Sequence, residues 1–552
     1  MDKNKELASL IFPEIDKTIE DYIKMYPKRD LPEGACVTRF APSPTGFMHL
    51  GGFYQAIIDY LMAKNTNGVF YLRNEDTDQK REVESAVELI MTTLKHYGIN
   101  PDEYEFKGNV VGNYGPYIQS ERKEIYHAFI KHLIEIGRAY PCFCTKEELD
   151  EIRTMQEASK QRTGYYGRYA KCRRMKVEEM IEKVKAGVPY TIRFKSNGNF
   201  EKKFFFNDLV RGMLSLPEND QDIVIMKSEN KLPTYHFAHF VDDFLMGTTH
   251  VVRGEEWLPS VPIHVELFNA FGVEAPKYIH TPLIVKKEGN STRKLSKRKD
   301  PEATMSYYEE HGYPIEAVIE SLLTIINSNY EEWHTANPDK SYLEFVYSPK
   351  KMSATGGALY DMEKLANISK NIISKLSAVE LYNRLLEWTS KYDKEFNELI
   401  TKYKDYTIDI LNIERCQAKP RKDYENYESI RPLISYMYDE LYNPESYDFG
   451  KINDIEEVKN IVNTYMNEYY DSNDDKDTWF NKIKELCDRL GYASNMKEYK
   501  ANPENFKGNV ADLTTAIRVS VTSRSQTPDL YEILRLLGKD RILDRVNNIN
   551  IK

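Results

Sequence analysis

The sequence has little of what marks a secreted or membrane-spanning chain. It contains 6 cysteines in 552 residues, too few for a disulfide framework. No stretch approaches the roughly 20 apolar residues that a helix needs to cross a bilayer. Residues 1–30 are amphipathic and rich in acids, without the apolar core and cleavage site of a signal peptide. We therefore expect a cytoplasmic protein that does not bind membranes.

An excess of positive charge is also absent. The formal net charge is −10, with 41% hydrophobic and 29% charged residues, which is ordinary for a globular protein. This balance does not exclude RNA as a partner, because a protein that holds a folded RNA needs only one basic face. The length predicts about three to five packed units. There is no internal repeat and no long low-complexity segment.

Short β-rich runs alternate with helical patterns from Val37 onward, in the order strand, glycine turn, helix, strand. This alternation predicts βαβ units and a parallel sheet. The rhythm breaks between about 113 and 228, where the strands look antiparallel, and it resumes with "HVVRGEEW" and a single strand over "KYIHTPLIVKK". The simplest account is a Rossmann-like, doubly wound α/β fold interrupted by an inserted domain.

Helical patterns dominate after about residue 310. In "TPDLYEILRLLGKDRI" we expect Thr527 to cap a helix that Gly538 ends. The predicted divisions are a helical extension (1–36), the first half of the α/β domain (37–112), the inserted domain (113–228), the second half (229–290), a helical region that begins with a basic loop (291–375), and an all-helical domain (376–552).

The stretch "RFAPSPTGFMHLGG" (39–52) places a turn between a strand and a helix. Gly51 and Gly52 carry no side chains that would keep a phosphate from the N–H groups of the helix N-terminus. His49 beside them is placed to donate to a phosphate oxygen. The alternative is a proline-rich strand end with a surface histidine. The spacing leaves both open, since it is neither Gly-x-Gly-x-x-Gly nor a Walker pattern.

A second basic element is "RKLSKRKD" (293–300), where Lys294 and Lys297 flank a serine. Such a loop can hold departing phosphate oxygens, although most basic loops are simply solvated. A competing element begins at Lys351 ("KMS") but lacks a second lysine three residues further on.

Five motifs occur in a fixed order: "RFAPSPTG", "YLRNEDTD", "PTYHFAHFVDD", "VVRGEEW" and "KLSKR". Together they resemble the glutamyl-tRNA synthetases, class I aminoacyl-tRNA synthetases of the bacterial type, from about residue 39 to 545. The resemblance implies a catalytic domain, an inserted domain that binds the tRNA acceptor stem, and a helical anticodon-binding domain. It implies that glutamate is activated with ATP and Mg²⁺ and passed to the 3′ end of tRNA(Glu). A monomer is expected.

The resemblance also implies roles for particular residues. The catalytic set is His49, Lys294 and Lys297. The residues that bind ATP are Pro42, Thr45, Gly46, His49, Gly51, Gly52, Leu295, Ser296 and Lys297. Those that bind glutamate are Arg39, Ala41, Ser43, Glu75, Tyr235, His239, Arg253 and Trp257.

Two arginines and one acid in the glutamate set suit the charges of the amino acid. Arg39 and Arg253 can pair with carboxylates, and Glu75 with the ammonium group. Two alternatives remain open, in which Arg253 only braces Glu255 and Trp257 belongs to the core. His239 stands where an asparagine is common in the family.

Three cysteines of the predicted inserted domain lie close in the sequence: Cys142, Cys144 and Cys172. Some family members bind zinc here, and zinc usually takes four ligands. No fourth ligand has conventional spacing; Tyr166 and Tyr169 are the candidates. The alternative is a set of reduced, partly buried thiols.

Alternatives to the leading function also exist. The enzyme can be non-discriminating and charge tRNA(Gln) as well, or it can be a tRNA-modifying relative, which the helical C-terminal domain disfavours. A non-catalytic RNA-binding paralogue would be expected to lose His49, Lys297 or Arg253, and all three are present. In the C-terminal region, tyrosines such as Tyr427, Tyr436 and Tyr438 either stack on RNA bases or pack a helical bundle.

Overall fold

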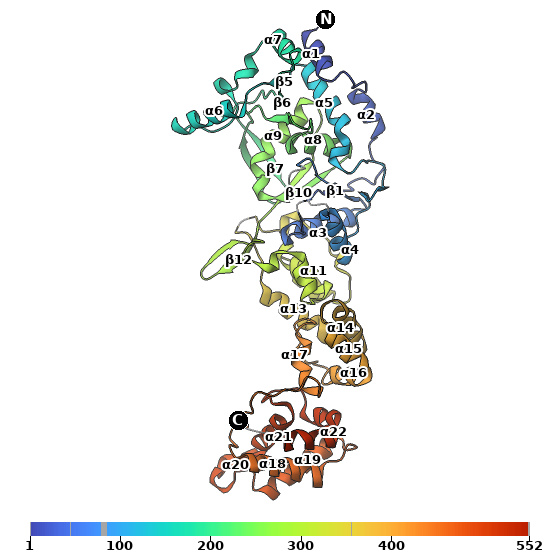
Figure 1. Ribbon diagram of the computed structural model, residues 1–552, viewed down its shortest axis with the longest axis vertical. Helices are drawn as coiled ribbons and strands as arrows, with labels where there is room; N and C mark the ends of the chain where they lie inside the picture. The colour runs from blue at the N-terminus through green and yellow to red at the C-terminus, as the bar shows by residue number, and fades with distance from the viewer. Residues whose placement is uncertain (1, 45, 79–84, 355, 550–552) are drawn as a thin grey trace. The chain divides into compact units, whose positions relative to one another are not determined.

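The computed structural model describes residues 2–44, 46–78, 85–354 and 356–549. The chain forms two compact units (Figure 1). The first comprises Met1–Tyr308 and Ile319–Asp361, and the second Glu309–Val318 and Met362–Lys552. The main segment of the second unit thus starts at 362, whereas the predicted division lies at 376. The end of helix α13 (Met362–Lys375) belongs with it, because Ile373 is in its core and Arg415 Nη1 donates to the Ile373 carbonyl (2.7 Å).

The first βαβ element is built as predicted. Strand β1 (Val37–Phe40) leads through helix α3 (Leu50–Asn65) to β2 (Val69–Leu72), which pairs with it in parallel. The return from α3 is tight: a Cβ on Gly68 would lie 1.9 Å from the Cys36 carbonyl oxygen, so only glycine fits there. Helix α4 (Ala86–His96) and the antiparallel pair β3 (Tyr104–Phe106) and β4 (Asn109–Val111) follow.

The second half of the fold lies against the first. Helix α8 (Tyr235–Leu245), strand β10 (His250–Gly254), helix α9 (Val261–Ala270) and strand β11 (Lys277–Thr281) follow one another, with β10 and β11 parallel. The Thr249 N–H donates to the Val37 carbonyl (3.0 Å), which sets β10 beside β1. The predicted Rossmann-like fold is confirmed. In such sheets, ligands bind at the carboxyl ends of strands where the strand order reverses.

The interrupting segment has its own antiparallel sheet of β5 (Ala139–Cys142), β6 (Thr191–Phe194) and β9 (Val224–Met226), with helices α5 (Lys123–Glu135), α6 (Lys146–Ala158) and α7 (Val177–Lys185). One hairpin predicted within 113–228 lies elsewhere. Strands β7 (Lys203–Asp208) and β8 (Gly212–Pro217) extend the β10–β11 sheet, because β7 pairs in parallel with β11 through Asp208 and Tyr278.

The strand expected over "KYIHTPLIVKK" is two strands in different sheets. After β11, the chain enters β12 (Ile284–Glu288), which pairs with β13 (Ser291–Lys294) and with the short β14 (Ala358–Leu359). Helices α10 (Met305–Glu310), α11 (Ile315–Ile326) and α12 (Tyr330–Ala336) lie between β13 and β14 in the sequence.

The N-terminal extension forms helices α1 (Lys3–Ile11) and α2 (Ile19–Met25), which pack on α5; α1 also packs on α7 (Figure 1). Leu7 and Phe12 are buried in the core of the first unit. Beyond α2, the Arg29 guanidinium donates to both Glu103 oxygens (2.7 and 2.8 Å) and to the Met246 carbonyl (2.8 Å). The extension is thus attached to the interrupting segment and to both halves of the α/β fold.

The remainder of the second unit is helical, as predicted. After α13 come α14 (Ala378–Tyr392), α15 (Lys394–Lys402), α16 (Lys404–Asn412), α17 (Ile430–Ile434), α18 (Ile455–Thr464), α19 (Lys476–Leu490), α20 (Met496–Ala501), α21 (Val510–Thr522) and α22 (Leu530–Asn547). The predicted cap of α22 is wrong: Asp529, not Thr527, accepts from the Glu532 N–H. Gly538 (φ 75°, ψ 164°) breaks the helix, which then continues to Asn547.

The C-terminal tyrosines pack the helical core. Tyr427, Tyr436 and Tyr438 are all buried in it. This arrangement agrees with bundle packing and not with base stacking. Among the described residues, no helix has both the length and the apolar character to cross a bilayer.

We expect Arg29→Ala to destabilise the first unit by about 3 kcal/mol, since it leaves the largely buried Glu103 without its cationic partner. Scanning calorimetry should show a lowered midpoint for the transition of that unit. Lys28→Ala, at the exposed neighbouring residue, should change the stability by less than about 0.5 kcal/mol. Equal midpoints for the two variants would show that the Arg29 contacts contribute little.

Candidate functional site

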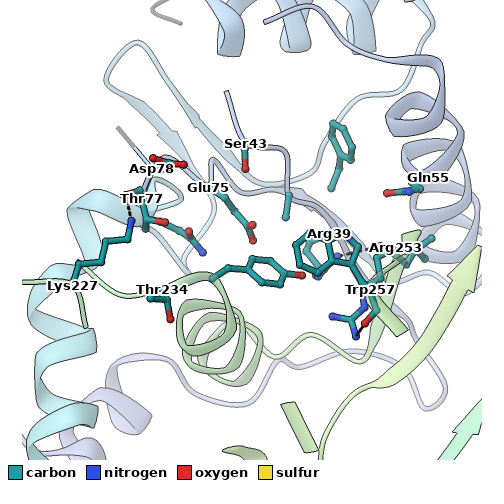
Figure 2. A pocket seen from close by; sticks show the side chains of 15 residues that line it. Arg39, Ser43, Gln55, Glu75, Thr77, Asp78, Lys227, Thr234, Arg253 and Trp257 are labelled. Atoms are coloured by element: carbon teal, nitrogen blue, oxygen red, sulfur yellow. Dashed lines mark hydrogen bonds between the residues drawn. The ribbon is translucent and has the colours of Figure 1, made fainter. Parts of the chain in front are cut away.

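A cavity of about 360 Å³ opens at the carboxyl ends of β1 and β10 (Figure 2). Its cationic side chains include Arg39 from β1 and Arg253 from β10, and its acidic side chains include Glu75. Of the residues predicted to bind glutamate, all but His239 line it. Neighbouring strand ends therefore bring together groups that are more than 200 positions apart in the sequence, Arg39 and Arg253.

Arg39 is almost fully buried and is held by an acid beneath the cavity. Its Nε lies 3.3 Å from Asp243 Oδ1, and its Nη1 donates to the Val252 carbonyl (3.4 Å). Burial opposes the charge, but the Asp243 carboxylate outweighs it and raises the pKa of Arg39. The same Asp243 accepts from Arg73 Nη1 (2.7 Å). Arg39 therefore carries a fixed positive charge at the cavity wall.

Among the described residues, Glu75 is one of two acidic side chains that line the cavity, with Asp78. Its Oε1 accepts from Arg73 Nη2 (2.9 Å), which orients the carboxyl group. Burial raises the pKa of Glu75, and the charges of Arg73 and Arg39 oppose this rise. A bound ammonium group would favour the ionised form further.

Arg253 donates to neutral groups: His280 Nε2 (3.0 Å), His264 Nδ1 (3.0 Å) and the Trp257 carbonyl (3.3 Å). It does not brace Glu255, which pairs with Arg211 and accepts from the Leu283 N–H.

Trp257 is not a core residue. It is 38% exposed, and its ring centroid lies 4.5 Å from that of Tyr235. The two aromatic rings together form an apolar wall of the cavity.

His239 lies beneath this wall rather than in it. Tyr235, His239 and Asp243 follow one another at i, i+4 and i+8 on α8, so each is one turn deeper than the last. His239 Nε2 bonds with the Tyr278 hydroxyl (2.9 Å), and burial lowers its pKa well below the ordinary value. The ring supports the wall and remains neutral.

A second cavity, of about 230 Å³, lies at the start of α3. Five residues predicted to bind ATP or to act in catalysis line it: His49, Gly51, Gly52, Lys294 and Leu295. Pro42, Gly46, Ser296 and Lys297 are not in its lining, and Thr45 is outside the described residues. Gln55 lines both cavities, so the two meet on one face of α3.

His49 caps α3 with its side chain. Its Nδ1 accepts from the Gly51 N–H (2.9 Å), so the ring proton is on Nε2. A Cβ on Gly51 would lie only 3.2 Å from that Nδ1. Burial, with Lys297 and Lys294 nearby, lowers the pKa of His49 to about 4. At neutral pH the imidazole is therefore an uncharged N–H donor beside the helix N-terminus.

The basic loop at 293–300 is held in shape by hydrogen bonds to its last residue, Asp300. This carboxylate accepts from Arg293 (2.7 and 2.8 Å) and from the Ser296 N–H (3.0 Å), and these bonds lower its pKa. Lys297 Nζ donates to the Phe47 carbonyl, which joins the loop to the turn before α3. The competing Lys351 accepts at its carbonyl from the Ser328 N–H and does not line either cavity.

Several site residues escaped the sequence reasoning. Arg73 and Asp243 occur in the motifs "YLRNEDTD" and "PTYHFAHFVDD", and the helical spacing of Asp243 from Tyr235 was a usable signal. Gln55 was missed as well, and its signal was its place on α3, one helical turn after Gly51. Lys227, whose Nζ donates to the Thr77 carbonyl (2.7 Å; Figure 2), had no signal of its own.

The three cysteines converge with a tyrosine that was not among the candidates. The sulfur atoms of Cys142, Cys144 and Cys172 all lie within 4.8 Å of one another. The Tyr165 hydroxyl is 3.4 Å from Cys142 Sγ and 3.3 Å from Cys144 Sγ.

The predicted candidates are engaged elsewhere: Tyr166 donates to the Arg162 carbonyl and Tyr169 to Gln161. Hydrogen bonds from the neighbouring thiols of Cys144 and Cys172 lower the pKa of Cys142.

This fold and these cavities match known families. Residues 35–339 match the family model "tRNA synthetases class I (E and Q), catalytic domain", and residues 381–550 match "Anticodon binding domain". The chain is therefore a class I aminoacyl-tRNA synthetase, an enzyme class that uses ATP.

Individual relatives show which family of this enzyme class the chain belongs to. The chain is 48% identical to the glutamate–tRNA ligase of Clostridium perfringens strain 13 (98% of this chain, 100% of that one) and 47% identical to that of Acetivibrio thermocellus (99% of each). It resembles the crystal structure of a glutamate tRNA ligase from Elizabethkingia meningosepticum in complex with its amino acid, with a TM-score of 0.74 and 28% identity over 93% of this chain and 98% of that one. The chain belongs to the glutamate–tRNA ligase family.

We expect the neutral state of His49 to make stability depend on pH. Its folded pKa of about 4 is below the ordinary 6.5, so the unfolded chain binds more protons and stability rises from about pH 4 to 6.5. His49→Asn keeps an acceptor for the Gly51 N–H but does not titrate. Thermal unfolding across this range should show a pH dependence smaller by about 3 kcal/mol, with stability at pH 7 nearly unchanged. An unchanged pH dependence would show that His49 titrates normally.

Proposed function

We propose that the protein joins glutamate to tRNA(Glu) in two steps, through a glutamyl-adenylate made from ATP. The observation that carries this proposal is the meeting of two cavities at Gln55. One has the charges that suit glutamate, and the other has donors and glycines that suit phosphates.

The charges of the larger cavity select glutamate. Arg39 and Arg253 pair with its carboxylates, and Glu75 takes its ammonium group. Tyr235 and Trp257 exclude water from one side. Glutamine in the same place would leave a buried arginine opposite an uncharged amide, which costs binding free energy because the arginine charge is then unpaired.

In the first step, a carboxylate oxygen of glutamate attacks the α-phosphorus of ATP. The bond from this phosphorus to the oxygen that bridges to the β-phosphate breaks, and pyrophosphate leaves with that electron pair. His49 Nε2–H, the N–H groups at the start of α3 and Lys294 stabilise the phosphate charge. Lys297 reaches the leaving pyrophosphate when the loop shifts from Phe47. Catalysis rests on positioning and charge, so no protein nucleophile is needed.

In the second step, a hydroxyl oxygen of the terminal ribose of tRNA attacks the activated carbonyl, and AMP leaves. The six cysteines, all of them described, are unpaired, which supports a place in the reducing cytoplasm.

Mg²⁺ fits the smaller cavity because Mg²⁺ is typically held by one or two carboxylates and by substrate phosphates. Glu256 supplies a carboxylate there. When bound with ATP, the ion would neutralise phosphate charge.

Zinc fits the cluster of Cys142, Cys144, Cys172 and Tyr165. Three sulfur atoms and one phenol oxygen give four ligands around a common centre, the number that structural zinc takes. The ion would tie the strand end at Cys142 to the loop that contains Cys172.

Pyrophosphate exchange tests the first step. With glutamate, ATP, Mg²⁺ and tRNA(Glu), we expect exchange that stops when glutamate is omitted, and charging assays on purified tRNA(Glu) and tRNA(Gln) define the RNA partner. Lys297→Met should lower the exchange rate by about 10²–10³-fold. Lys287→Met, on the exposed part of the β12–β13 hairpin, should leave it unchanged. Absence of exchange in the wild type would refute the proposal.

Metal analysis tests the zinc site. We expect about one zinc per chain in the wild type, loss of the metal in Cys144→Ser, and weaker retention against a chelator in Tyr165→Phe. Tyr166→Phe is the matched control and should retain zinc as the wild type does. If Tyr165→Phe and Tyr166→Phe behave alike, Tyr165 is not a ligand.

A further inference from the structure

Arg253 differs from Arg39 in what holds it. Arg39 faces the carboxylate of Asp243, whereas Arg253 donates to two imidazoles and one carbonyl and interacts with the Tyr235 hydroxyl, all of them neutral groups. Neutral acceptors fix the orientation of a guanidinium without cancelling its charge. Arg253 is thus a buried arginine of the cavity lining whose charge is not offset by a carboxylate in these hydrogen bonds.

The direction of each bond follows from the chemistry of arginine. A guanidinium only donates, so His264 Nδ1 and His280 Nε2 both accept, and each ring carries its proton on the other nitrogen. His280 Nδ1–H then donates to Asp208 Oδ2 (2.7 Å), and His264 Nε2–H donates to His236 Nδ1 (3.0 Å). One arrangement of protons satisfies the whole chain of contacts.

The surroundings keep this arrangement. His264 and His280 are fully buried, and burial lowers the pKa of both imidazoles. Asp208 is itself fixed by the N–H groups of Val210 (3.0 Å) and Arg211 (2.9 Å). The ring of Tyr278 lies 4.7 Å from the guanidinium carbon. The histidines therefore have few alternatives in position or protonation.

The contacts leave a defined part of Arg253 for a ligand. Of its five N–H groups, the imidazoles and the carbonyl use one on Nε, one on Nη1 and one on Nη2, so five minus three leaves one on each Nη atom. The Tyr235 hydroxyl, which lies in the same cavity wall, also interacts with the guanidinium. Two N–H groups on the two Nη atoms can bind a carboxylate through two parallel bonds.

We propose that His264 and His280 are positioning residues that orient Arg253 to recognise a carboxylate of glutamate. The inference rests on the proposed function of the cavity. Neither histidine lines the cavity. Without the acceptor of either ring, the guanidinium can turn, and without His280 it can pair with Asp208 and lose its free charge. A misplacement of this kind costs about 10- to 100-fold in kcat/KM.

The two rings present opposite nitrogens to Arg253, which permits a reciprocal test. The amide of asparagine takes the place of Nδ1 of a histidine, and the amide of glutamine takes the place of Nε2. His264→Asn and His280→Gln therefore keep an acceptor for Arg253, whereas His264→Gln and His280→Asn remove it.

We expect the two variants that lose the acceptor to raise the KM for glutamate by about 10- to 100-fold in tRNA-dependent pyrophosphate exchange. The KM for ATP should stay within about 2-fold, since the ATP-side cavity is lined by other residues. The two variants that keep the acceptor should have a nearly normal KM for glutamate. Circular dichroism and thermal unfolding confirm that each variant is folded.

A role in packing alone would give a different pattern. Asparagine would then be the worse substitute at both positions, because it is the smaller residue, and the KM values for ATP and glutamate would rise together. Either result overturns the inference while glutamate-dependent exchange by the wild type still supports the enzyme. A double-mutant cycle with Arg253→Lys adds a second readout: the losses should not add if the histidines act through Arg253, and additive losses would also overturn it.

Discussion

The structure of the first unit depends on how it pairs charges that are removed from water. Asp243 contacts both Arg39 and Arg73, and Arg73 in turn contacts Glu75, so one network crosses from α8 to the ends of β1 and β2. Asp242, the next residue on α8, pairs with Arg122 at the start of α5 (2.7 Å). An isolated buried charge would cost several kcal/mol. The pairing makes an ionic site stable inside an apolar fold, and it fixes the strand ends to α8.

Some charged side chains of the larger cavity have a partner of opposite charge, and others are held by neutral groups. Arg39 has an acidic partner, and Glu75 has a cationic one, whereas Arg253 is surrounded by neutral acceptors. His49 follows the same logic at the smaller cavity, where burial keeps an N–H donor uncharged. Arg39 thus stays charged and His49 stays uncharged near neutral pH.

Much of the fold and part of the candidate site could be predicted from the sequence. The errors concerned individual strands and side chains. The βαβ pattern and ordered motifs predicted the Rossmann-like fold, the helical C-terminal unit and the main charged residues of the two cavities, but fewer than half of all the residues that line them. The hydrophobic periodicity could not show that β7 pairs with β11. An amphipathic strand suits the sheet of the interrupting segment as well as the β10–β11 sheet. It could not choose Tyr165 among three nearby tyrosines, since that choice depends on a three-dimensional convergence of sulfur atoms. A motif match also does not reveal depth below a surface, and His239 lies beneath the cavity wall rather than in it.

The anchoring of Arg29 also constrains the order of folding. Its partners follow it by 74 residues at Glu103 and by 217 residues at Met246. The contact with Met246 must wait until α8 has been synthesised. Contacts of such long range form late and slow the folding of a chain. The segment that carries Arg29 is thus among the last to be secured, after α1 and α2 can already pack on α5.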